Sequence, residues 1–306
     1  MSRFDVFGIG QVCVDYLGRV PYYPDVEGRI ELRETTIRSG GPTATALLVL
    51  ARLGMRVALI GKLGDDDLGR MAIQDLQKEG IDTSFLIREK GKKTQVSFIP
   101  VERESGRRTV FWSRGTITPL KSKDIKKKFI TQSSAIHFDE LFVEATVEAA
   151  LIAKKSGVVV SMDAGNYEDG IEELKGKVDL FIASESFMKE YSEEENPSKG
   201  IKKLKEFGAK VTAVTLGSKG SLTIYDNEQI QIPAYPVRAV DTTGAGDIFH
   251  GAFLYGWLKG WEIRQTLRFA SAAAAMNCLS LGAHGGIPKK PEEVFDFMKR
   301  AKIGKS

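Results

Sequence analysis

The hydrophobic residues of this chain change repeatedly from a strand-like to a helix-like spacing. Short apolar runs predict buried strands, and stretches with apolar residues at every third or fourth position predict helices between them. The predicted strands span residues 4–10, 57–61, 135–138, 158–162, 179–183 and 211–216. The predicted helices span residues 43–53, 67–79, 143–155, 198–207, 244–258 and 263–281. This alternation predicts an α/β fold with a mostly parallel central sheet covered by helices on both faces.

Two segments, at about 13–39 and 94–114, break the alternation. Residues 95–99 read QVSFI and residues 109–112 read TVFW, and no helical stretch separates such runs. A period of two gives a strand one covered face and one wet face. We therefore expect a small inserted sheet that stands off the main sheet as a lid over an active edge. The alternative is an edge hairpin of the main sheet.

Composition and charge narrow the classes of function. The chain has 306 residues, with 44 Lys and Arg against 40 Asp and Glu, so no concentrated basic excess indicates nucleic-acid binding. Cys13 and Cys278 are too few for a disulfide scaffold or a Cys-rich zinc site, and we expect both to be buried. Neither a membrane span nor a signal peptide is recognisable, so we expect a cytoplasmic protein with no membrane partner.

Common nucleotide and metal motifs are missing. Residues 8–13 read GIGQVC, so Cys13 stands where a dinucleotide fingerprint needs its third glycine, which argues against a dehydrogenase. No G-x-x-x-x-G-K-[ST] run is present. His137, His250 and His284 are far apart in the sequence and lack metal-ligand spacing, so we expect structural roles for them.

The strongest chemical signal is a glycine-rich turn at residues 240–253, which read VDTTGAGDIFHGAF. Gly244 and Gly246 remove side chains at a helix start, where unpaired backbone N–H groups and the helix dipole attract a phosphate. Asp247 lies in the first turn, where a carboxylate can take the proton of a hydroxyl that attacks a phosphoryl group. A helix N-cap would explain one acidic residue, but not the whole run.

This turn resembles the C-terminal signature of the phosphofructokinase-B (pfkB, ribokinase-like) carbohydrate kinases. Residues 39–42 (SGGP), 51–54 (ARLG) and 60–69 (IGKLGDDDLG) resemble the N-terminal signature of the family, and residues 215–220 (TLGSKG) resemble its ATP-contacting turn. The resemblance covers essentially the whole chain. It implies a single ribokinase-like domain over residues 1–306, folded as a three-layer α/β/α sandwich with a β-sheet lid.

The resemblance also implies roles for individual residues. Asp247 would be the catalytic base, and the anion hole would be formed by Gly244, Ala245 and Gly246. Sugar-binding positions would be Asp15, Gly40, Gly41, Thr45 and Arg108. ATP-binding positions would be Thr215, Gly217, Ser218, Lys219, Gly220, Ala273 and Asn277. Simpler alternatives remain: a turn carboxylate for Asp15, an exposed lid charge for Arg108, and helix packing for Ala273 and Asn277.

Metal and substrate expectations follow from the same resemblance. Asp241 and Thr243, with the glycine-rich turn 282–286, resemble the site of a monovalent cation such as K⁺. An N-x-x-E stretch that organises Mg²⁺ in many members is replaced by SESF at residues 184–187, so we expect ATP phosphates and water to hold Mg²⁺, with Glu185 beside them. Thr45 replaces an Asn that often contacts the sugar. The GGP-x-x-TA and FHGA runs resemble ketohexokinases and sulfofructose kinases, which favours a ketose or sulfonated ketose.

The resulting hypothesis is an ATP-dependent sugar kinase that phosphorylates a primary hydroxyl. The alternatives are a nucleoside kinase of the same fold and, because the N-x-x-E stretch is missing, a non-catalytic sugar or nucleotide sensor. A homodimer formed through the β-lid is a further expectation. Phe98, Phe111 and Trp112 either supply its apolar contact or face the substrate.

Overall fold

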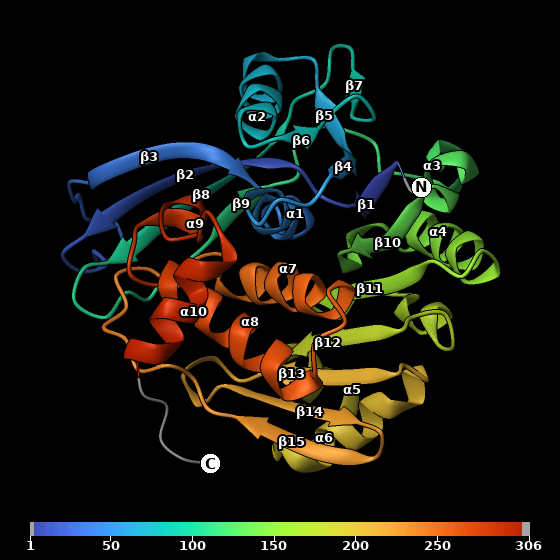
Figure 1. The fold of residues 1–306 in the computed structure, drawn as a ribbon. Helices are drawn as coiled ribbons and strands as arrows, with labels where there is room; N and C mark the ends of the chain where they lie inside the picture. Colours follow the sequence, from blue (N-terminus) through green and yellow to red (C-terminus); the bar gives the residue numbers. More distant parts are fainter. Residues whose placement is uncertain (1–2, 302–306) are drawn as a thin grey trace.

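A nine-stranded sheet forms the centre of the computed structural model, which describes residues 3–301 (Figure 1). Its strand order is β15-β14-β13-β12-β11-β10-β1-β4-β6, parallel from β13 to β6 and antiparallel at the β14 and β15 edge. The strands are β1 (Phe4–Ile9), β4 (Val57–Ile60), β6 (Ile81–Asp82), β10 (Ser133–Phe138), β11 (Val159–Ala164), β12 (Leu180–Ser184), β13 (Val211–Thr215), β14 (Ser221–Tyr225) and β15 (Glu228–Ile232). Met1 and Ser2, where no signal peptide is expected to begin, and residues 302–306 lie outside the described residues.

Helices cover both faces of this sheet, and each face has its own apolar core. One core includes residues of α1 (Pro42–Arg52), α2 (Asp67–Lys78), α7 (Ala245–Leu258), α8 (Ile263–Asn277) and α10 (Pro291–Arg300). The other includes residues of α3 (Lys127–Thr131), α4 (Val143–Lys155), α5 (Glu185–Ser192) and α6 (Pro197–Leu204). The expected three-layer α/β/α arrangement is therefore confirmed.

A separate four-stranded sheet forms the lid, and the alternative of an edge hairpin is wrong. Its order is β3-β2-β8-β9, formed by β2 (Cys13–Val20), β3 (Arg33–Gly40), β8 (Gln95–Glu102) and β9 (Phe111–Ser113). Strands β2 and β8 are parallel, and the two outer pairs are antiparallel. A further small sheet pairs β5 (Lys62–Gly64) with β7 (Ile87–Glu89).

The register of the lid sorts its side chains onto two faces, because directly paired residues share a face and successive residues alternate. On the inner face, Leu17, Ile99 and Val101 are buried and pack against Leu281, just before the short helix α9 (Gly282–Gly285). Phe98 pairs with Phe111 on the outer face. Trp112 pairs with Ser97 and therefore lies on the inner face, so the three aromatic residues do not share one role.

Most predicted bounds agree with the structure within two residues, but the helix expected over 263–281 ends at Asn277. Gly286 packs so closely that a Cβ there would overlap the Asn277 backbone, and Gly282 has a φ of +77°. The strand expected at 109–112 begins only at Phe111. Helices α5 and α10 and the β14–β15 hairpin were not predicted, although residues 226 and 227, both at positive φ, have the Asp-Asn sequence of a tight turn.

The two cysteines are buried and unpaired, as expected. Within residues 3–301, no helix combines the length and the apolar character needed to cross a bilayer.

Candidate active site

The glycine-rich turn lies at the start of α7, as predicted. Gly244 is the N-cap residue and has a φ of +76°, and a Cβ there would overlap the Cβ of Ala283. Gly246 is exposed, and a Cβ there would meet no atom within 4 Å. The first N–H groups of a helix have no intrahelical acceptor, so this open turn offers donors to an anion.

Asp247 is partly exposed in the first turn of the same helix. Burial, followed by the negative charge of Asp163, raises the pKa of the Asp247 carboxyl to about 7, while His250 and Arg108 act in the opposite direction. A pKa near neutral suits a general base, because the group is substantially ionised at working pH and still has a useful proton affinity.

The lid brings Asp15 to this site. Its side chain is buried against Gly40, where a Cβ would overlap the carboxylate, and it accepts a hydrogen bond from Cys13 Sγ at 3.3 Å. Burial raises the pKa of Asp15, whereas Cys13, Ser97 and Arg108 act against that shift. Both the Asp15 and the Arg108 charges act on Asp247, so the lid and the α7 turn face each other.

Arg108 and the other predicted sugar-site residues also lie at this junction. Arg108 Nη1 donates to Thr242 Oγ1 at 2.9 Å, which ties the lid to the turn before α7. Gly41 has a φ of +110° and packs against the carbonyl of Gln11. Thr45 is buried in α1, and its Cγ2 would be 3.5 Å from a Cβ at Gly244. The predicted sugar positions are thus brought together with the anion turn.

The predicted nucleotide turn follows β13. Residues 217–219 form one turn of 3₁₀ helix, flanked by Thr215 and by Gly220, which has a φ of +93°. Within this turn Ser218 is exposed, and Lys219 Nζ lies 3.6 Å from Glu185 Oε1. Because Thr215 pairs with Ser184 across β12 and β13, the Glu185 segment and the nucleotide turn are neighbours.

The two residues predicted on α8 lie deeper. Ala273 and Asn277 are fully buried, Ala273 within an apolar core. Asn277 Nδ2 donates to the carbonyl oxygen of Thr243 at 3.0 Å. In this structure Asn277 therefore supports the turn before α7.

Asp241 organises the turn before α7. Its Oδ1 accepts from Thr243 N at 2.8 Å and from Thr243 Oγ1 at 2.7 Å, and its Oδ2 accepts from Gly282 N at 2.8 Å. The carboxylate is fully buried, and no Lys, Arg or His within residues 3–301 lies at ion-pair distance. A buried carboxylate without a cationic partner fits a bound cation.

Three buried acidic residues near the site were not predicted: Asp139, Glu140 and Asp163. Burial raises the pKa of Asp139 to about 6, and burial with the Asp163 charge raises that of Glu140 to about 8. Asp163 Oδ1 lies 3.1 Å from His250 Nε2; burial opposes ionisation of Asp163, but His250 holds its pKa below the usual value. Each acidic residue lies at or directly after the carboxyl end of a parallel strand, which is the signal that could have located it.

The histidines were expected to be structural. His137 and His250 are in fact neighbours, with ring centroids 5.9 Å apart, and both are buried. Among the residues that the structure describes, no group of three His, Cys, Asp or Glu side chains could hold a metal ion.

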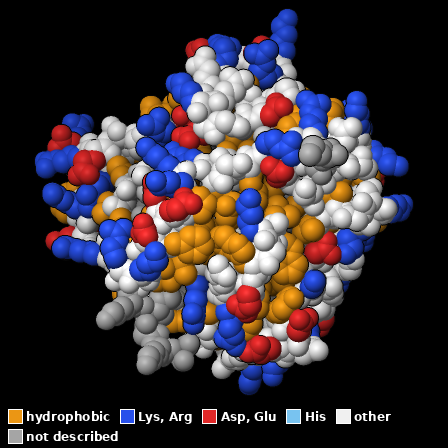
Figure 2. All heavy atoms as spheres, in the orientation of Figure 1, with side chains coloured by type: hydrophobic (Ala, Val, Ile, Leu, Met, Phe, Trp, Pro, Cys, Tyr) orange, Lys and Arg blue, Asp and Glu red, His pale blue; other side chains and the backbone are white. Residues whose placement is uncertain are grey.

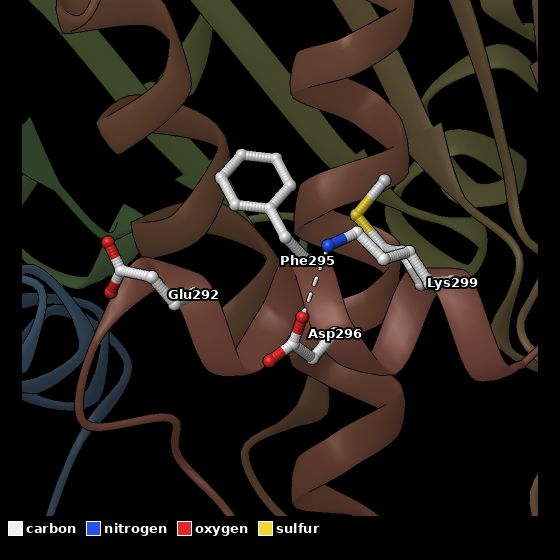
Figure 3. A pocket seen from close by; sticks show the side chains of 5 residues that line it. Glu292, Phe295, Asp296 and Lys299 are labelled. Atoms are coloured by element: carbon white, nitrogen blue, oxygen red, sulfur yellow. Dashed lines mark hydrogen bonds and ion pairs between the residues drawn. The ribbon is translucent and has the colours of Figure 1, made fainter.

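A hollow of about 430 Å³ lies on α10 and contains none of the predicted site residues (Figure 3). Its lining residues are Glu292, Phe295, Asp296, Met298 and Lys299. The candidate active site is therefore the junction between the lid and the α7 turn.

The chain is similar to known kinases over nearly its whole length. Residues 4–290 match the family model described as "pfkB family carbohydrate kinase". A ribokinase from Haemophilus influenzae is 28% identical over 301 residues, covering 96% of this chain and 98% of the relative. A nucleoside kinase from Methanothermobacter thermautotrophicus is 26% identical over 298 residues, covering 96% and 95%. The crystal structure of a ribokinase from Thermotoga maritima has a TM-score of 0.83 at 29% identity, covering 97% and 99%. The chain therefore belongs to the pfkB family of carbohydrate kinases and is a phosphotransferase that acts on an alcohol group of a sugar or nucleoside.

Proposed function

We propose that residues 1–306 form one kinase domain that transfers the γ-phosphate of ATP to a primary hydroxyl of a sugar. The observation that carries this proposal is the meeting of two features from distant parts of the chain. The open amide turn at Gly244–Gly246 can hold a phosphoryl group, and Asp247 beside it faces the buried lid carboxylate of Asp15. A phosphate site, a base and a hydroxyl acceptor thus come together at one sheet edge.

In the proposed reaction, Asp15 and the backbone around Gly40 and Gly41 hold the sugar hydroxyls. Asp247 takes the proton of the attacking hydroxyl, whose oxygen forms a bond to the γ-phosphorus while the bond to the β-phosphate oxygen breaks and ADP leaves. The backbone N–H groups of residues 244–246 stabilise the charge on the transferring group, and Arg108 closes the lid side.

ATP would lie along residues 215–220, with Lys219 near its phosphates and Asn277 supporting the turn through Thr243. Mg²⁺ would enter with ATP and supply charge neutralisation of the phosphates. Glu185, already paired with Lys189 and Lys219, would act only from beside the metal ion. Asp241 and Thr243 would hold a monovalent cation such as K⁺.

Two sequence runs and one residue of the lid bear on which molecule accepts the phosphate. A ketose or sulfonated ketose is the substrate that the GGP-x-x-TA and FHGA runs favour. One observation favours a nucleoside: Trp112, which is 54% exposed, lies on the inner lid face where a base could stack on it. If the acceptor is a nucleoside, Trp112→Ala should raise its KM strongly; with a small sugar as acceptor, the same variant should leave KM almost unchanged.

The deciding experiment is a screen for ADP release with ketoses, aldoses, sulfofructose and nucleosides, using wild type and Asp247→Asn. We expect one sugar class to be turned over by wild type only. No turnover of any acceptor while ATP still binds would favour the sensor, and turnover restricted to nucleosides would assign the alternative kinase. Equal turnover by Asp247→Asn would show that the base is misassigned.

We also propose a homodimer through the outer face of the lid. Ile37, Phe98 and Phe111 are 45%, 52% and 60% exposed there, and Tyr16 stacks on Phe98 with ring centroids 5.1 Å apart. Such an apolar face favours a second copy of the chain. Sedimentation velocity at micromolar concentration tests this proposal: Phe98→Lys should give monomers, whereas Trp112→Lys on the inner face should not.

A further inference from the structure

A further cavity, lined by several charged side chains, lies at the end of the lid away from Asp15. Its volume is about 550 Å³, and it is lined by Arg19, Pro21, Arg103, Glu104, Arg238, Ala239 and Val240. Arg19 belongs to β2 and Arg103 follows β8, whereas residues 238–240 belong to the segment that leads to the α7 turn. Figure 2 shows that charged side chains crowd this end of the molecule. The cavity therefore lies between the lid and the core.

The charges in this cavity are unbalanced, with three arginines against one glutamate. Arg19 is anchored by Glu34 at 3.2 Å and by the carbonyl of Arg103 at 3.0 Å, yet its buried Nε has no hydrogen-bond partner among residues 3–301. In the same part of the chain, no carboxylate lies within ion-pair distance of the Arg103 or Arg238 guanidinium. The exposed guanidinium groups of Arg103 and Arg238 and the unpaired buried Nε of Arg19 thus surround one cavity.

The cavity is distinct from the sugar site. Arg19 lies four residues beyond Asp15 on the same strand face, which corresponds to roughly 13 Å along a strand. The apolar contact of Leu17 and Ile99 with Leu281 fills the space along this inner face between the two ends of the lid. None of the predicted sugar positions lines this cavity.

We propose that this cavity binds the phosphate group of a small metabolite and that the bound phosphate links the lid to the core. Arginine guanidinium groups recognise phosphate through paired hydrogen bonds, and a cavity of this volume also has room for a small organic group. The lid already rests on this segment, because a Cβ at Gly106 would lie 2.9 Å from the carbonyl oxygen of Ala239. A phosphate held by Arg103 and Arg238 would add contacts across the same junction and favour the closed lid.

The test is calorimetric titration of the full chain with glycerol 3-phosphate, inorganic phosphate and, as the neutral control, glycerol. A saturating non-hydrolysable ATP analogue with Mg²⁺ keeps the α7 turn occupied. We expect the phosphate probes to bind and glycerol not to bind. Arg103→Gln and Arg238→Gln should each weaken binding by about tenfold or more, since each removes a charge-assisted contact. Arg56→Gln, at an exposed arginine that is paired with Asp5 outside the cavity, should leave it unchanged.

Tighter binding of glycerol 3-phosphate would identify an ester as the ligand, and equal binding would identify free phosphate. Failure of both probes to bind, or binding that neither glutamine variant weakens, would overturn the proposal. Thermal unfolding checks that each variant is folded, and because Arg103 is exposed its glutamine variant remains informative if Arg238→Gln is unstable. The binding result does not rest on the proposed kinase function. Binding is measured without turnover, so the phosphate site and the proposed kinase function can fail separately.

Discussion

The protonation of Asp247 offers a quantitative test of the proposed mechanism. Its carboxyl has a pKa of about 7 instead of the usual 3.8, chiefly because burial and the charge of Asp163 disfavour the ionised form. The base acts when ionised, so kcat/KM should fall as the pH drops below this pKa. At about pH 6, roughly one tenth of the enzyme would carry the ionised base, and kcat/KM should be about tenfold below its plateau. An aspartate of ordinary pKa would lose almost nothing there.

The assay is kcat/KM against pH with the best acceptor from the screen, because this ratio reports groups of the free enzyme. His250 acts to lower the pKa of Asp247, so in His250→Gln the fall of kcat/KM on the acid side should move to higher pH. Asp163→Asn should move it to lower pH. His250 is not among the main causes of the raised pKa of Asp139 or Glu140. If the pH dependence of kcat/KM is the same in His250→Gln as in wild type, a group other than Asp247 is titrating. If kcat/KM of the wild type falls only below pH 5, Asp247 is not a base of raised pKa and the reasoning is refuted.

Three further outcomes are expected. Asp247→Asn should lower turnover by about a thousandfold or more while ATP binding measured by calorimetry persists, and near-normal turnover would exclude a base role. Gly244→Ala should cost at least about 1–2 kcal/mol of unfolding free energy from its left-handed backbone alone, besides the overlap with Ala283, whereas Gly246→Ala, with open space around it, should retain the wild-type Tm; equal Tm values would contradict the geometry. Asp241→Asn should weaken any K⁺ activation seen with the best acceptor, and undiminished activation would place the cation elsewhere.

The fold was largely predictable because its pattern is local. Buried parallel strands are continuous apolar runs, and the helices between them carry an apolar face of helical period, so order and type could be read along the chain. The lid strands were found for the same reason. Bounds failed where tertiary contacts decide them. Helix α8 ends at Asn277, whose side chain donates to the Thr243 carbonyl and against which Gly286 packs closely. The β14–β15 hairpin was missed although its two-residue turn is visible in the sequence.

The residues of the candidate site also fall into two groups, those that the sequence predicts and those that it does not. Residues within one continuous motif, such as Gly244 and Asp247, could be named because backbone geometry and chemistry are encoded together over a few positions. Asp139, Glu140 and Asp163 were not named, because no motif marks them, and Asp163 becomes a neighbour of the adjacent pair Asp139 and Glu140 only where parallel strands end at one edge.

By itself, then, the sequence determined the layered fold and the lid segments and marked the glycine-rich turn as the candidate phosphate site, since these depend on periodicity and on runs of adjacent residues. Only the tertiary structure decided what surrounds that turn. Packing between distant segments sets the pKa of Asp247, turns Phe98 outward and Trp112 inward, and gathers Arg19, Arg103 and Arg238 around one cavity. Burial and charge proximity depend on distances through space, which the order of residues along a chain does not specify.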